Sequence, residues 1–335
     1  MDKVVARWRS RGRSGLWILL LCSLFAAATE QSRAADASSG TLVPVSVVAG
    51  GLERSLSFYV PVKLGGDAPL LLALHPAGGS GAEMRAATGR EFETLADQQG
   101  FVVAYPDGID GNWNDCRKAA DYPARALNVD DEGFVAAIVA RAVRDLAIDP
   151  RRVFAVGYSN GAQMAYRLAL ARPDLVAGIA AVAAGLPAPE NLDCKPAGRP
   201  VPVMIINGTA DPINPFKGGL VTLGPSLNFG TVIATEATAR YFARLNGDGD
   251  EPAVSTLPHL DPADPTKVRR MAWSAPDKAP VVLYVVDGGG HIFPQRRVRF
   301  PASLGRQTGD LDAPVTIWDF FAALSGHAAA AGDQR

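Results

Sequence analysis

The chain has 335 residues, which is long enough for one large α/β domain or for two smaller domains. Its hydrophobic share of 48% and its charged share of 20% are ordinary for a soluble globular protein. The formal net charge of -1, without a basic stripe, gives no electrostatic basis for binding nucleic acid.

The first 34 residues have the pattern of a secretory signal peptide. A basic segment, Arg7 to Arg13, precedes an apolar run from Leu16 to Ala28. This run is shorter than the roughly 20 residues that a membrane helix needs. Ser32 and Ala34 supply small residues for signal peptidase, so cleavage is predicted near Ala34. An uncleaved membrane anchor is the alternative.

Export would place the remaining chain outside the cytoplasm, in the periplasm or the medium, without stable membrane association. Removing residues 1–34 takes away six basic and two acidic residues and leaves a formal net charge of -5. That charge argues against an anionic polymer as substrate. The two cysteines that remain, Cys116 and Cys194, have one possible pairing in an oxidising compartment. A disulfide is therefore predicted, with two free thiols as the alternative.

Residues 35–53 are predicted to form a linker and a first strand. Val43–Val48 and Leu56–Val60 are rich in β-branched and aromatic residues and flank Gly50-Gly51, which predicts an antiparallel hairpin.

Apolar runs and amphipathic segments then alternate along residues 54–325. Short apolar runs are typical of strands buried on both faces, and they occur at Leu70–Leu74, Phe101–Tyr105, Val153–Val156, Ile179–Ala183, Val203–Ile206 and Val281–Val286. Helices are predicted at Glu91–Gln99, Asp131–Leu146, Ala162–Arg172 and Ile317–Leu324. This alternation predicts a single α/β domain with a doubly wound, mostly parallel sheet, followed by a flexible tail at 326–335.

The segment Asn214–Asp277 is less regular. It contains a helical piece, Glu236–Leu245, and one strand, Val268–Trp273. We expect it to leave the main sheet and to cover part of the functional site.

The pentapeptide Gly157-Tyr158-Ser159-Asn160-Gly161 matches the pattern G-x-S-x-G. It lies directly between a predicted strand and a predicted helix, the setting of a nucleophile elbow. A serine hydroxyl needs a base to take its proton and a carboxylate to orient that base. Ser159 is therefore the candidate nucleophile, and a glycine-rich turn without catalysis is the alternative.

In this fold class the acid and the histidine should follow the serine in that order, each beyond a strand. His291 follows the run Val281–Val286 through a flexible glycine-rich loop and is the candidate base. His75 precedes the serine, whereas His259 and His327 lie in irregular or terminal segments.

The candidate acid is Asp211, which follows the run Val203–Ile206. Asp287 and Asp310 are the alternatives, although Asp287 would share the loop of His291.

The oxyanion requires two backbone N–H donors. One is expected from Asn160. The other is expected from the loop that begins at His75, where Pro76 has no N–H.

That loop leaves Ala77 or Gly78 as the second donor, and a plain turn is the alternative. Trp113 is a candidate aromatic wall for the substrate, unless it packs near Cys116. Tyr158 and Phe293 flank the catalytic candidates and are also assigned to substrate binding. No residue pattern predicts a metal site or a cofactor.

Six motifs in this order resemble the polyhydroxybutyrate depolymerase-like esterases of the α/β-hydrolase superfamily, which include feruloyl and acetylxylan esterases. The resemblance covers residues 54 to 325. Its motifs are Leu74-His75-Pro76 through Gly79, Tyr105-Pro106-Asp107-Gly108, Val129-Asp130-Asp131 with Gly133-Phe134, Gly157 through Gly161, Gly208-Thr209-Ala210-Asp211-Pro212 and Gly288-Gly289-Gly290-His291.

The resemblance implies the same triad, Ser159, Asp211 and His291, and is consistent with a Cys116–Cys194 pair. The chain departs from the family where Ile292-Phe293-Pro294 replaces Thr-Trp-Pro and where Pro76 replaces a glycine. Both departures flank the site and therefore concern substrate choice.

Together these patterns predict a secreted serine esterase that acts through an acyl-enzyme. Its expected substrate is a small-molecule ester, a polyester or a plant-polysaccharide ester. An acyltransferase with the same triad and a non-catalytic binding protein on this scaffold are the alternatives.

Overall fold

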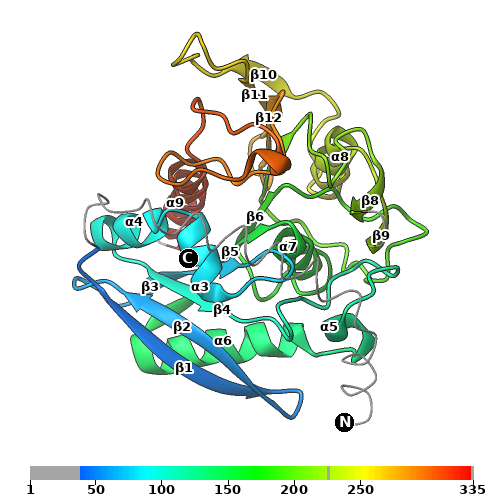
Figure 1. Cartoon of the computed structure of the whole chain (residues 1–335). Helices are drawn as coiled ribbons and strands as arrows, with labels where there is room; N and C mark the ends of the chain where they lie inside the picture. Colours follow the sequence, from blue (N-terminus) through cyan, green and yellow to red (C-terminus); the bar gives the residue numbers. More distant parts are fainter. Residues whose placement is uncertain (1–37, 225–226, 333–335) are drawn as a thin grey trace.

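A computed structural model describes residues 38–224 and 227–332 of the chain, with side chains described up to residue 324 (Figure 1). The predicted signal peptide lies outside the described residues. Within the described residues, no helix is long and apolar enough to cross a membrane.

A ten-stranded sheet runs through the molecule in the order β1-β2-β4-β3-β5-β6-β7-β12-β11-β10. Its strands are β1 (Thr41–Ala49), β2 (Leu52–Val60), β3 (Ala68–Leu74), β4 (Val102–Pro106), β5 (Ile148–Tyr158), β6 (Gly178–Val182), β7 (Val203–Gly208), β10 (Ala253–Thr256), β11 (Lys267–Trp273) and β12 (Val281–Asp287). The six central strands are parallel to one another, and their order in the sheet is β4-β3-β5-β6-β7-β12. The remaining pairings, at the two edges, are antiparallel.

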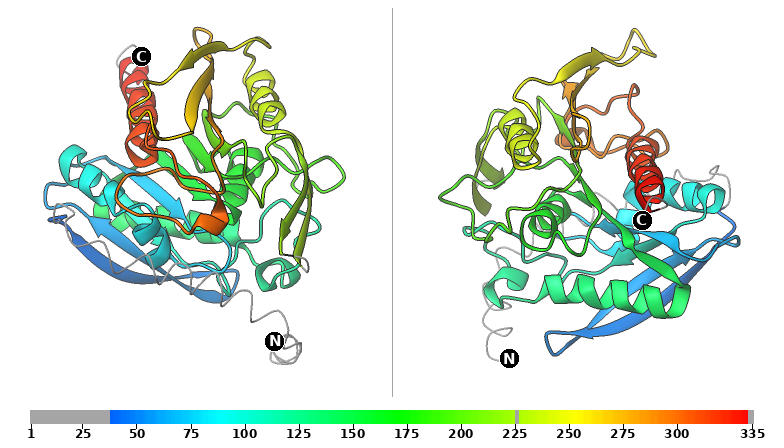
Figure 2. Two further views of the ribbon diagram at one scale, coloured as in Figure 1. Left: turned by 45° about the horizontal axis from the view of Figure 1, so that its top comes forward. Right: turned by 180° about the vertical axis from the view of Figure 1, so that it is seen from behind.

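Helices cover both faces of this sheet (Figures 1 and 2). They are α3 (Gly81–Ala87), α4 (Glu91–Gln99), α5 (Pro123–Ala126), α6 (Asp131–Leu146), α7 (Asn160–Ala171), α8 (Thr235–Leu245) and α9 (Ala313–Gly332). Helix α6 begins at the N-cap Asp130, whose carboxylate accepts the N–H of Gly133 at 2.8 Å. The predicted tail at 326–335 begins inside α9.

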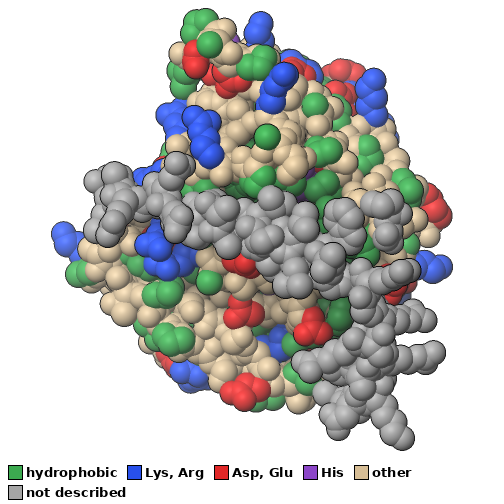
Figure 3. Space-filling model, viewed as in Figure 1, with side chains coloured by type: hydrophobic (Ala, Val, Ile, Leu, Met, Phe, Trp, Pro, Cys, Tyr) green, Lys and Arg blue, Asp and Glu red, His purple; other side chains and the backbone are tan. Residues whose placement is uncertain are grey.

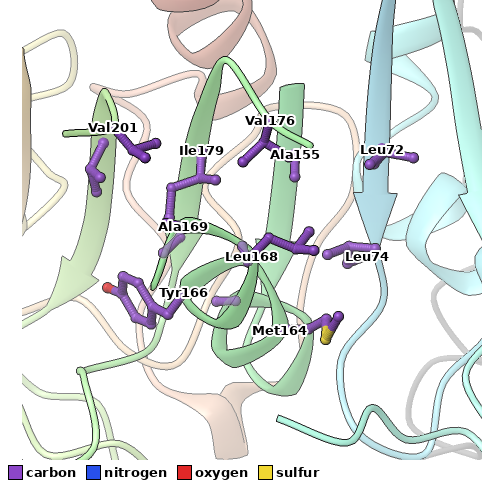
Figure 4. Close-up of a cluster of buried hydrophobic side chains, with 14 of the residues drawn as sticks. Leu72, Leu74, Ala155, Met164, Tyr166, Leu168, Ala169, Val176, Ile179 and Val201 are labelled. Atoms are coloured by element: carbon purple, nitrogen blue, oxygen red, sulfur yellow. The ribbon is translucent and has the colours of Figure 1, made fainter. Parts of the chain in front are cut away.

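Alternate residues of each central strand pack against opposite helix layers, as the two-residue repeat of a strand requires. Leu70, Leu72 and Leu74 of β3 are buried in the core beneath α6, α7 and α8. Leu71 and Ala73 are buried in the core beneath α4 and α9. Figure 4 shows side chains of α7 packed against the central strands in the first of these cores.

The predicted single α/β domain with a doubly wound, mostly parallel sheet is therefore confirmed. The β1–β2 hairpin turns at Gly50-Gly51 as expected, although its second strand begins earlier, at Leu52.

The segment Asn214–Asp277 was expected to leave the main sheet, and this expectation is wrong for its second half. Strands β10 and β11 extend the sheet beside β12. The first half does leave it, because β8 (Gly219–Leu223) and β9 (Leu227–Val232) form a separate antiparallel hairpin. This hairpin has its own small apolar core, which includes Val221, Phe229 and Tyr122.

Candidate active site

Ser159 lies where β5 ends and α7 begins. Its backbone adopts φ 55° and ψ -112°, a conformation that non-glycine residues rarely occupy. The N–H of Ser159 donates to the carbonyl of Val182 on the neighbouring strand at 2.9 Å. Ser159 is partly exposed although the residues on either side of it are buried. The turn therefore presents the hydroxyl at the carboxyl edge of the parallel strands.

The two glycines around this serine are required by close backbone contacts. A Cβ on Gly157 would lie 2.1 Å from the carbonyl oxygen of Gly161. A Cβ on Gly161 would lie 2.2 Å from the carbonyl oxygen of Leu74 on β3. Only glycine fits at both positions, which explains the spacing of the G-x-S-x-G pattern in physical terms.

The side chains of His291 and Asp211 meet across two loops at the same edge of the sheet. His291 Nδ1 lies 2.8 Å from Asp211 Oδ2, and the two side chains are 6% and 1% exposed. Asp211 Oδ1 also accepts the N–H groups of Ile213 and Asn214, both at 2.8 Å. An ionised carboxylate only accepts, so Nδ1 carries a proton, and in the neutral form of the ring the lone pair is on Nε2.

The two alternative acids have other partners. Asp287 is 40% exposed and forms an ion pair with Arg269 at 2.7 Å. Asp310 contacts His259 Nδ1 at 2.8 Å and accepts the N–H of Leu260. Neither carboxylate is paired with His291, so the geometry favours Asp211 among the three.

The glycine-rich loop before His291, expected to be flexible, is tightly bound on two sides. Gly289 accepts the N–H of Ala210, which joins the loop to that of Asp211 at 2.9 Å. The N–H of His291 donates to Leu304 at 2.7 Å, and the Tyr158 hydroxyl donates to the carbonyl of His291 at 2.7 Å. These bonds hold the backbone of His291, and with it the imidazole, in place. Tyr158 therefore contacts the candidate base through a backbone carbonyl.

The loop after β3 reaches the serine from the other side. The N–H of Gly78 donates to the carbonyl of Gly111 at 2.8 Å, so Gly78 is a poor candidate for oxyanion donor. Ala77 lines the pocket beside Ser159, and its N–H donates to no atom in the described part of the chain. Asn160 is the first residue of α7, where helical N–H groups lack intrahelical partners. Ala77 and Asn160 are therefore the candidate donors.

His75 supports this loop from inside the protein. Its Nε2 accepts the N–H of Gly108 at 2.8 Å, and its Nδ1 lies 2.8 Å from the carbonyl oxygen of Pro76. Complete burial lowers the pKa of His75 to about 4, so the ring is neutral with its proton on Nδ1. His75 is thus a structural residue below the oxyanion loop, which agrees with its exclusion as the base.

One pocket opens onto Ser159 and His291. Its lining also includes residues that sequence reasoning did not single out as site residues, namely Arg117, Ile213, Val221, Leu223, Phe229 and Leu304. Three of these, Val221, Leu223 and Phe229, come from the β8–β9 hairpin, which therefore covers part of the pocket as expected. Residues 227–230 alternate between apolar side chains and polar or small ones, which was the available signal for the second strand of this hairpin. Arg117, in a loop, carried no such signal.

Two predicted substrate contacts are not brought to this pocket. Trp113 is fully buried, and its indole N–H donates to the carbonyl of His75 at 3.0 Å. It shares a core with Cys116, as in the alternative interpretation. Phe293 is also fully buried and packs edge-on against Phe92 and Tyr158. Both side chains therefore support the walls of the site from within.

The predicted disulfide is present. Cys116 and Cys194 are bonded, with their Cα atoms 5.0 Å apart. The bond joins the loop after β4, which also carries Arg117, to the loop after β6. No group of three or more His, Cys, Asp or Glu residues in the described ranges is arranged to hold a metal ion.

The chain is similar to known esterases in sequence and in fold. The model of the phospholipase/carboxylesterase family matches residues 130–223. A relative from Nocardia uniformis subsp. tsuyamanensis, named "Putative esterase NocK", is 34% identical over 260 residues, which are 75% of this chain and 73% of that protein. Feruloyl esterase B of Piromyces equi is 29% identical over 71% of this chain, but the match spans 42% of that longer protein.

Among solved structures, the acetyl xylan esterase from Aspergillus awamori has the same fold. Its TM-score is 0.53 at 20% identity, over 76% of this chain and 95% of that chain. The fold and these relatives define a carboxylic ester hydrolase of the α/β-hydrolase class. The chain belongs to the same esterase family as the relative from Nocardia uniformis subsp. tsuyamanensis, and it is similar to feruloyl and acetylxylan esterases.

Proposed function

We propose that this protein is a secreted serine esterase whose catalytic triad is Ser159, Asp211 and His291. The observation that carries the proposal is the placement of these three residues. The serine is on a strained strand-to-helix turn. His291 lines the pocket into which that turn opens, and Asp211 lies within hydrogen-bond distance of His291 Nδ1.

The reaction begins when Ser159 Oγ attacks the ester carbonyl carbon and gives its proton to His291 Nε2. Asp211 keeps the proton of Nδ1 in place and stabilises the imidazolium. The N–H groups of Ala77 and Asn160 donate to the oxyanion. The imidazolium then protonates the leaving alcohol as the carbon–oxygen bond breaks. A water molecule then takes the place of the serine hydroxyl: it gives a proton to His291 and attacks the acyl-enzyme, and the carboxylic acid and the free serine are released.

The substrate is an ester with a compact acyl group. Ile213, Val221, Leu223, Phe229 and Leu304 give the pocket a mainly apolar lining, which suits an aryl or short alkyl group. The relatives' names, feruloyl esterase and acetylxylan esterase, point to the same range of acyl groups. Figure 3 shows charged side chains of both signs spread over one face, a surface without a single-sign field for a charged polymer.

Secretion is supported by the sequence of the leader and by the disulfide between Cys116 and Cys194. Disulfides persist in oxidising compartments and are rare in the reducing cytosol.

Replacing the nucleophile tests the proposal. Ser159→Ala should lower kcat for p-nitrophenyl acetate by on the order of 10⁵-fold, because the acyl-enzyme can no longer form. A fluorophosphonate probe should label the wild-type protein at Ser159 and leave this variant unlabelled. Ser46→Ala, on the exposed edge strand β1, is the matched control.

Full turnover by Ser159→Ala, or labelling at another residue, would exclude the assignment. Parallel assays with methyl ferulate, acetylated xylan and polyhydroxybutyrate film then identify the acyl group. Failure on all three would exclude the proposed substrate range while leaving the triad intact.

A further inference from the structure

A buried guanidinium forms part of the substrate pocket. Arg117 is only 4% exposed, yet it lines the pocket together with Ser159 and the hairpin residue Phe229. Its Cζ lies 5.1 Å from the centre of the Phe229 ring. The proposed mechanism assigns no step to this positive charge. Burying an arginine among apolar side chains costs free energy unless the charge is paired.

One edge of the guanidinium is fully occupied. Nε donates to both oxygens of Asp115, at 3.2 and 3.1 Å, and Nη2 donates to Oδ2 at 2.6 Å. Nη2 also donates to the Tyr122 hydroxyl at 3.1 Å. Burial alone would lower the pKa of Arg117, but the charges and hydrogen bonds of Asp115 and Tyr122 together outweigh burial and raise that pKa above its usual value. The arginine is therefore permanently charged, and Asp115 neutralises it.

The other edge is free to meet a ligand. Within the described part of the chain, the side-chain hydrogen bonds of Arg117 leave from Nε and Nη2 alone, so both N–H groups of Nη1 are uncommitted. Two charged donors in a mainly apolar pocket favour a ligand that brings an acceptor to them.

The position of Arg117 relative to the triad indicates which part of the ester it meets. Asp115 Oδ2 also accepts Nδ2 of Asn160 at 2.7 Å, so Arg117 belongs to the side of the pocket that carries this oxyanion donor. His291 protonates the leaving alcohol, which places the alcohol on the histidine side. The acyl chain therefore extends toward Arg117.

We propose that Arg117 Nη1 binds a neutral oxygen acceptor on the acyl chain, such as an ether, hydroxyl or carbonyl oxygen, and so selects oxygen-bearing acyl groups over alkyl ones. A neutral acceptor fits because Asp115 already supplies the one negative charge that Arg117 requires. A second carboxylate would add an uncompensated buried charge. The inference rests on the proposed function, because it uses the same serine and the same pocket.

The test compares p-nitrophenyl esters in which one CH₂ of the acyl chain is replaced by oxygen. The pairs are methoxyacetate with butyrate, 3-methoxypropanoate with pentanoate, and 4-methoxybutanoate with hexanoate. The wild-type enzyme should favour one oxygen-bearing ester over its partner by about tenfold in kcat/KM, the effect of one hydrogen bond to a charged donor. p-Nitrophenyl hemisuccinate measures the response to an anionic acyl group.

Arg117→Lys retains a positive charge for Asp115 but lacks the second edge of donors. It should reduce the oxygen preference to less than about twofold, with a smaller change in kcat/KM for the alkyl esters. Arg125→Lys is the matched control, since Arg125 is in the nearby helix α5 and is paired with Asp193 outside the pocket.

If the wild-type enzyme hydrolyses all pairs equally, the inference is wrong while the esterase proposal stands; this measurement does not depend on whether any variant folds. A preference for hemisuccinate would also overturn it, because the site would then bind anions. If no ester is hydrolysed, the proposed function itself fails.

Discussion

The Asp211 carboxylate is in a setting that an amide cannot reproduce. Three N–H donors point at its two oxygens: one from His291, and one each from the backbone of Ile213 and Asn214. An asparagine would place an NH₂ group against at least one of these donors. The histidine would then favour the opposite tautomer, with its proton on Nε2, and could not act as the base that we propose for Ser159.

Asp211→Asn should therefore lower kcat for p-nitrophenyl acetate by about 10³- to 10⁴-fold with little change in fold. Steady-state kinetics and a circular dichroism spectrum of the same preparation measure the two effects. Asp287→Asn serves as the control, because that carboxylate pairs with Arg269 and has no contact with the imidazole. The reverse ranking of the two variants would move the acid to Asp287.

The position of a single site residue could be predicted from the sequence where that residue directly follows a strand. Ser159, Asp211 and His291 each follow a buried apolar run, so their meeting at one edge of the sheet was predictable. The exposure of Trp113 and Phe293 was not predictable, because it depends on distant partners. Trp113 is covered by His75 and its neighbours, and no local pattern indicates this.

At the scale of elements, the tightest constraint is where helix α7 crosses strand β3. The Cα of Gly161 faces the backbone of Leu74, and a Cβ there would lie 2.2 Å from a carbonyl oxygen. Backbone atoms cannot rotate away as a side chain can, so α7 would have to move off the sheet.

Gly161→Ala should accordingly lower the free energy of unfolding by about 1–3 kcal/mol, the usual cost of overpacking. Urea unfolding followed by fluorescence measures this difference. Gly65→Ala is the matched control, since an added Cβ at that position has nothing within 4 Å. Equal stability of the two variants would show that α7 tolerates displacement, and the close-contact explanation of the motif would fail.

Strand existence was predictable for the central elements and less so at the edges. Central strands are buried on both faces and therefore appear as continuous apolar runs. Strand β10 is exposed along its whole length and sits at the sheet edge, so its sequence carries little of that signal. Its place in the sheet is set by pairing with β11, which is a long-range contact rather than a local pattern.

At the scale of the whole molecule, one covalent bond ties together the loops that surround the pocket. Cys116 and Cys194 are separated by 78 residues, and the closed loop contains α5, α6, β5, α7 and β6. Cross-linking a loop of this length removes conformational freedom from the unfolded chain, worth roughly 4.5 kcal/mol in the chain-entropy treatment. Measured values are commonly lower, since the unfolded state retains some structure.

The paired variant Cys116→Ala/Cys194→Ala, made in the chain from residue 35, should therefore lose about 2–4 kcal/mol of unfolding free energy. Urea unfolding with and without a reductant separates the cross-link from the lost core volume, because Cys116 is fully buried. Reductant should destabilise the wild-type protein and leave the variant unchanged. If reductant has no effect on the wild type, while mass spectrometry shows the gain of two hydrogens, the cross-link contributes nothing. The stability of the pocket loops would then come from their hydrogen bonds alone.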